Sequence, residues 1–151
     1  MITNRTQYDV DTAISILKNK VQKFQELEET DIATLEKGTI TYNTLNRIEN
    51  KQDELKNLFN EIGYWNTSIT NKVWGEDDIF NVDDFQRIID NTNILRNAFF
   101  VYKSTPNTPP ISYHYNDINA LEKILYDLDV MISNVKADYR YCGEFECGEL
   151  I

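Results

Sequence analysis

The sequence is poor in the residues that carry most metal and catalytic chemistry. Its 151 residues include one histidine, His114, and two cysteines, Cys142 and Cys147. A tetrahedral zinc site needs four ligands, and nucleophilic catalysis needs a Ser or Cys at motif spacing from a base, so neither chemistry is indicated. The five glycines form no phosphate-binding loop. The sequence therefore predicts a protein that is not an enzyme and that holds no metal ion or other cofactor.

Basic residues and long apolar runs are also scarce. Lys and Arg number 15 against 25 Asp and Glu, which gives a net charge of −10. Such a charge repels phosphate backbones, so we expect no nucleic-acid partner. The longest apolar run, residues 98–102, is far shorter than the roughly 20 residues of a membrane span. The polar start of the sequence lacks the apolar segment of a signal peptide, and we expect a protein that is made in the cytoplasm and does not bind a membrane.

Proline and glycine are few, and 41% of the residues are hydrophobic. This composition and length are typical of one folded domain with a sizeable core. All three prolines fall between residues 103 and 113. Because proline interrupts a helix, that segment is predicted to be a non-helical link between helices.

Four segments carry apolar residues at helical spacing. Thr6, Thr41 and Asn81 precede the first three segments and are typical N-cap residues. The four stripes are Val10, Ile14, Leu17, Val21 and Phe24; Leu45, Ile48, Gln52, Leu55, Phe59 and Ile62; Phe85, Ile88, Thr92, Leu95, Phe99 and Tyr102; and Ile118, Leu121, Leu125, Leu128, Ile132 and Val135. Because each stripe needs a partner to bury it, the sequence predicts an all-α, antiparallel four-helix bundle over residues 1–138.

Two connections are longer than such a bundle needs. Residues 28–40 predict one short helical turn, with Thr30 as its cap and Gly38 as its end. Residues 64–80 are too apolar for a solvated loop, and we expect them to fold back over one end of the bundle. Their aromatic residues admit two interpretations: they cap the bundle end, or they form a surface platform on which a sugar stacks. The residues of this platform are Tyr64, Trp65 and Trp74.

The last segment, residues 139–151, is predicted to be an extended docking tail. Its aromatic residues recur at period two, which favours a β-strand. A single strand after a helical bundle has no partner in its own sequence, so its backbone would pair with another chain. The expected partner-binding residues are Tyr139, Tyr141, Cys142, Gly143, Phe145, Cys147 and Gly148. The alternative is a tail that packs on its own bundle.

Several short sequence segments, taken together, resemble those of a known group of proteins. They are residues 2–11, 42–49, 95–99 and 119–125, and the Cys-Gly-Glu at 142–144 that returns at 147–149. In combination the chain resembles, over nearly its whole length, small virion or tail-associated proteins of phages and prophages of low-GC Gram-positive bacteria. None of these segments is a catalytic signature.

The resemblance implies a structural or adaptor component of a phage tail or baseplate-like particle. Such a protein would reside in the virion and bind other virion proteins or sister subunits in an oligomeric assembly. Two alternatives stay open at this point. One is a module that binds a host-surface glycan or receptor, and the other is a small acidic phage effector.

Overall fold

The structure is a computed structural model that describes residues 1–63, 68–112 and 114–144, with side chains as far as Asp138. These residues form α1 (Gln7–Asn19), the 3-10 turn η1 (Val21–Lys23), α2 (Glu29–Gly38), α3 (Tyr42–Glu61), α4 (Val82–Ala98) and α5 (Tyr115–Glu144). No strand occurs in the described ranges. The all-α prediction is confirmed.

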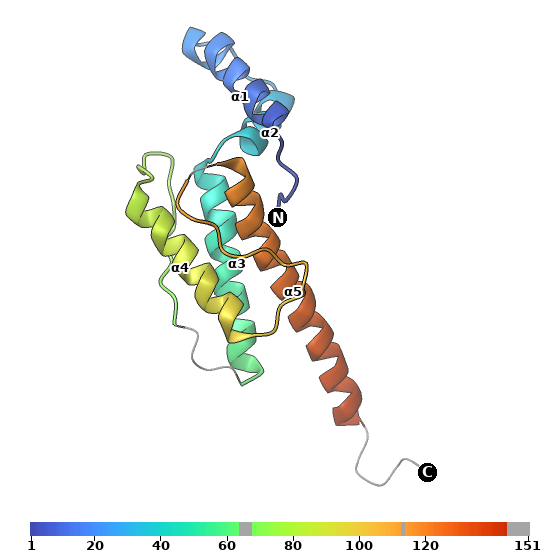
Figure 1. The fold of residues 1–151 in the computed structure, drawn as a ribbon. Helices are drawn as coiled ribbons and strands as arrows, with labels where there is room; N and C mark the ends of the chain where they lie inside the picture. Colours follow the sequence, from blue (N-terminus) through green and yellow to red (C-terminus); the bar gives the residue numbers. More distant parts are fainter. Residues whose placement is uncertain (64–67, 113, 145–151) are drawn as a thin grey trace.

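Helices α3, α4 and α5 form the body of the molecule (Figure 1). Thr41 and Asn81 cap α3 and α4 as predicted, each accepting a backbone N–H in the first turn. The core is drawn mainly from the last three predicted stripes: Leu45, Ile48, Leu55 and Phe59 of α3, Phe85, Ile88, Ile89 and Leu95 of α4, and Ile118, Leu121, Ile124, Leu125, Leu128 and Ile132 of α5. The predicted periodicity is therefore that of the buried faces.

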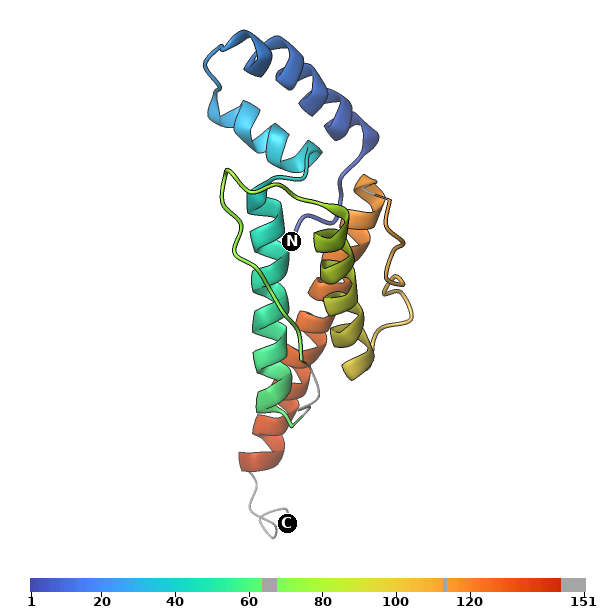
Figure 2. The same cartoon turned by 90° about the vertical axis from the view of Figure 1, so that its left-hand side faces the viewer.

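The three body helices run in the same direction, with both connections returning along the body (Figures 1 and 2). Ion pairs between the two longest helices show the same direction. Arg47 near the start of α3 pairs with Glu122 near the start of α5, and Glu61 at the end of α3 pairs with Lys136 further along α5. This parallel arrangement replaces the predicted antiparallel four-helix bundle. An apolar stripe specifies which face is buried, but the length of a connection decides whether the next helix can start at the same end.

Helices α1 and α2 form a separate antiparallel hairpin beyond the end of the body (Figure 2). Thr6 caps α1 as predicted. Two ion pairs tie the helices together, Asp9 Oδ1 to Lys37 Nζ at 3.0 Å and Lys20 Nζ to Asp31 Oδ2 at 2.5 Å. The predicted short turn is thus a helix of 10 residues, capped at Glu28 instead of Thr30.

Two further expectations need correction. Residues 68–81 lie along α3 instead of over the end of the bundle, because Asn46 bonds the backbone of Trp74 at both its N–H and its carbonyl. The backbone of residues 139–144 is the end of α5 and not a strand. No proline or glycine interrupts the sequence from Tyr115 to Cys142, so the helix continues through the predicted boundary at residue 138. Residues 145–151 lie outside the described residues.

Candidate functional site at the joint between hairpin and body

The N-terminal segment fastens the hairpin to the body. The backbone N–H of Ile2 donates to Glu122 Oε2 at 2.7 Å. The backbone N–H of Arg5 donates to Asn119 Oδ1 at 3.1 Å, and the Asn119 amide donates back to the Arg5 carbonyl at 2.9 Å. Residues 2 to 5 are therefore tied to the first turns of α5, directly before α1 begins.

A buried carboxylate lies between two arginines at this joint. Glu122 is fully buried, and its Oε2 lies 2.8 Å from Arg5 Nη1. Its Oε1 accepts from Arg47 Nε at 2.9 Å, with Arg47 Nη2 at 2.8 Å. The Arg5 side chain is 3% exposed and that of Arg47 is 27% exposed. Two guanidinium groups share one carboxylate, so this cluster carries a net charge of +1.

Two nitrogens of the cluster are left over. Arg5 Nη1 donates to the Ile2 carbonyl and to Glu122. Arg5 Nη2 is also buried, as is Arg47 Nη2, and neither has a hydrogen-bond partner within the described part of the chain. A buried donor without a partner is unusual in folded proteins and calls for an explanation.

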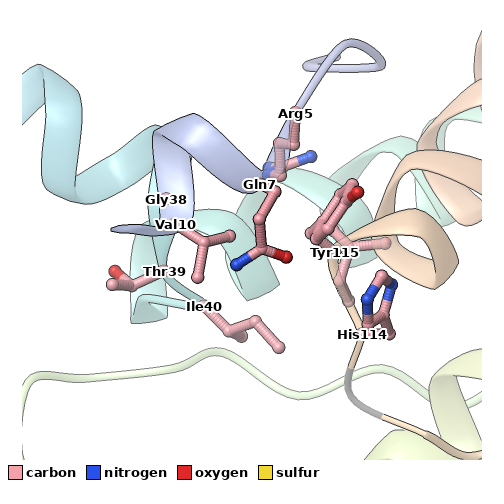
Figure 3. A pocket seen from close by; sticks show the side chains of 9 residues that line it. Arg5, Gln7, Val10, Gly38, Thr39, Ile40, His114 and Tyr115 are labelled. Carbon is pink, nitrogen blue, oxygen red and sulfur yellow. The ribbon is translucent and has the colours of Figure 1, made fainter. Parts of the chain in front are cut away.

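A pocket of about 400 Å³ adjoins Arg5 where the hairpin meets the body. Figure 3 shows the Gln7 side chain between Val10 on one side and Tyr115 on the other. The lining comes from the N-terminal segment, α1, the link between α2 and α3, and the start of α5: Arg5, Gln7, Val10, Gly38, Thr39, Ile40, His114, Tyr115 and Ile118. Polar donors and apolar surface thus face the same space.

A second buried carboxylate has a different environment. Glu49 of α3 is 1% exposed and pairs with both terminal nitrogens of Arg87 at 2.7 and 2.8 Å. It also accepts the Trp74 indole N–H at 2.7 Å and the Lys72 backbone N–H at 2.6 Å. The hydrogen bonds that Arg87 donates to Glu49 are the main cause that raises the pKa of Arg87. Arg87 also lies 3.7 Å from Asp84 Oδ1. The bonds of Glu49 to Lys72 and Trp74 fasten residues 72–74 to α3.

The hydrogen bonds of Glu49 also decide the position of one predicted platform residue. Trp74 is 3% exposed, with its ring edge-on to Phe80 at 5.6 Å. It therefore belongs to the core and offers no ring face for a sugar to stack on. Tyr64 and Trp65 lie outside the described residues.

The predicted tail residues are divided between described and undescribed parts of the chain. Tyr139, Tyr141, Cys142 and Gly143 belong to the last turns of α5, at the opposite end of the body from the hairpin (Figure 1). Phe145, Cys147 and Gly148 lie outside the described residues. Among the described side chains, no group of three or more His, Cys, Asp or Glu could hold a metal ion. None of the described helices is long and apolar enough to cross a membrane.

The first predicted stripe is not buried in a bundle. Helical spacing and the antiparallel pairing place five apolar residues on one side of the hairpin, which we call the hairpin face: Ile14, Leu17, Val21, Ile32 and Leu35. Ile14, Val21 and Ile32 are 40%, 39% and 50% exposed, and the other two are half-buried. The stripe was expected in the core, but α1 has α2 as its main partner and keeps this side uncovered.

Comparisons of the chain with protein-family models, curated proteins and solved structures found no match. The candidate sites therefore rest on the contacts described above. The Arg5–Glu122–Arg47 cluster was missed by reasoning from the sequence, because charged residues far apart in a chain carry no local signal that they meet.

Proposed function

We propose that the protein is a non-enzymatic structural adaptor that binds another protein through the hairpin face. The observation that supports this proposal is the exposure of Ile14, Val21 and Ile32 on one side of two paired helices. Apolar residues at helical spacing are normally covered by a neighbouring helix or sheet. Two helices alone cannot cover them, so an apolar surface from a partner would complete the packing.

The chemistry of the partner follows from the charge of the chain. With a net charge of −10, the protein favours a surface that is neutral or basic around an apolar centre. An amphipathic helix or a helical pair on the partner would match the shape of the hairpin face. The resemblance of the sequence to phage proteins supports a tail or baseplate-like particle as the setting and other virion proteins or sister subunits as partners.

The test is incorporation of variants into particles. Replacing Ile14 and Ile32 together by Glu places two charges on the hairpin face at positions that are already solvent-exposed, so the fold should persist. The matched control replaces Val73 and Ile79 by Glu, since each is 84% exposed and both lie outside the hairpin. Quantitative mass spectrometry of purified particles should show that the hairpin variant is depleted about tenfold or more, which corresponds to one buried charge in an interface.

Two outcomes would contradict this function. The hairpin variant could enter particles at the same copy number as the control. Alternatively, the unmodified protein could be found in infected cytosol and be missing from particles, which would favour the small acidic effector. Circular dichroism of both variants checks that the helical content is unchanged.

A further inference from the structure

The pocket at the joint is a positive site in a strongly acidic protein. The chain has 25 acidic residues, yet none of the nine residues that line the pocket is acidic. Arg5 is the one charged residue of the lining, and the cluster that it forms with Glu122 and Arg47 has a net charge of +1. Arg5 itself is 5% exposed, and its Nη2 has no partner within the described residues. An anion in the pocket would balance this charge, and a shift of the Arg5 side chain would let Nη2 donate to it.

The remaining lining indicates which anion fits. The side chains of Gln7, Thr39 and Tyr115 offer polar groups for one end of a ligand, and Figure 3 shows the Gln7 amide directed into the space. Val10, Ile40 and Ile118 supply apolar surface for the other end. A volume of about 400 Å³ lies within the range of small-molecule pockets. A ligand with one negative group and one compact apolar group would use both parts.

We propose that this pocket binds a carboxylate that carries a compact aliphatic group, with Arg5 Nη2 donating to the carboxylate. Such a group occurs both in a free branched-chain acid and at the C-terminus of a peptide that ends in an aliphatic residue. The proposal does not depend on the hairpin face, because none of the five residues of that face lines the pocket. Ligand binding there would also tie the hairpin more firmly to the body, since both contribute to the lining.

The test is an NMR titration of the full chain with two pairs of probes. The first pair is N-acetyl-leucine and its amide, and the second is an acetylated tetrapeptide ending in leucine and its amide. The amide signals of Gln7 and Tyr115 and the Arg5 side-chain signal should shift saturably with each acid that binds. We expect an acid to bind about tenfold or more tightly than its amide, as one charge-assisted hydrogen bond provides. Tighter binding of the tetrapeptide identifies a peptide terminus as the source, and tighter binding of N-acetyl-leucine identifies a free acid.

Two variants separate binding in the pocket from binding elsewhere. Val10→Phe fills the pocket from α1 without touching the buried ion pairs, and it should weaken the acid at least tenfold. Val21→Phe makes the same change at an exposed position of the hairpin and should leave binding unchanged. Arg5→Lys is a second variant that keeps the charge and removes the Nη2 donor, and it should also weaken the acid.

The proposal is overturned if neither acid binds more tightly than its amide. It is also overturned if inorganic phosphate at equal ionic strength shifts the same signals as strongly, because the site would then take any anion. Equal binding to the Val10→Phe and Val21→Phe variants would place the ligand outside the pocket.

Discussion

The absence of a side chain at Gly38 allows α1 and α2 to approach each other closely. A Cβ at this position would lie 2.3 Å from the Asp9 carbonyl oxygen and 2.5 Å from Ala13 Cβ. Helix propensity favours Gly38→Ala, but the clash opposes it, and we expect a net loss of about 1–3 kcal/mol from overpacking. Hydrogen exchange of α1 and α2 amides should become faster. Gly75→Ala is the control, since its Cβ would meet Asp78 Oδ2 at an ordinary 3.7 Å; equal effects would contradict the close approach.

Glu49 is the residue on which the connection after α3 depends. Glu49→Gln removes the buried charge partner of Arg87 and leaves it only Asp84, 3.7 Å away, and we expect a loss of about 3 kcal/mol in the free energy of unfolding. Urea unfolding followed by tryptophan fluorescence measures this loss, because Trp74 donates to the same carboxylate. In the control, Glu54→Gln removes the charge of a side chain that is 54% exposed and paired with Lys51, and the expected loss is below about 1 kcal/mol. Similar losses in both variants would argue against a buried role for Glu49.

At the scale of elements, the α1–α2 hairpin should be sensitive to acid. The pKa of Asp9 is lowered chiefly by its hydrogen bond with Thr6 and then by Lys37. The pKa of Asp31 is lowered chiefly by Lys20 and then by the Glu28 backbone. A lowered pKa means that the stabilisation is complete above the ordinary value of 3.8 and is lost as the pH falls below it. Both carboxylates bridge the two helices, so the hairpin should open in this range.

The measurement is the NOE between Ala13 and Gly38, which should weaken as the pH is lowered through this range. A variant with Asp9→Asn and Asp31→Asn should show a weaker NOE at neutral pH and little further change in acid. An NOE that stays constant while both aspartates titrate would mean that packing alone holds the hairpin.

Local features of these elements could be predicted from the sequence, and relations between elements could not. The caps at Thr41 and Asn81 and the buried faces of α3 to α5 depend on spacing within one segment. The direction of the helices escaped prediction, because a stripe has the same period whichever way its helix runs. For the candidate site, Arg5 and Glu122 are separated by 117 positions, and each alone is typical of a solvent-exposed charge.

On the scale of the whole molecule, the body and the hairpin differ in how they are stabilised. The body shares one apolar core among three helices, whereas the hairpin is held by ion pairs and by one buried alanine. Elements with few buried apolar contacts open at lower free energy than the core. The hairpin can therefore adjust to a partner or a ligand without unfolding the body, which suits an element that carries both candidate sites.

The far end of the molecule allows a last prediction about the adaptor. Among the side chains of α5 that the structure describes, as far as Asp138, Ile132 is the last fully buried one, and Lys136 makes the last ion pair to α3. Removing residues 139–151 should therefore change the free energy of unfolding by no more than about 0.5 kcal/mol. If the tail docks on a partner, the shortened protein should still bind through the hairpin face but should be lost from particles. Thermal unfolding and particle mass spectrometry separate these effects. Unchanged stability would show that loss from particles does not come from a damaged fold. A shortened protein that enters particles normally would leave the hairpin face as the docking end.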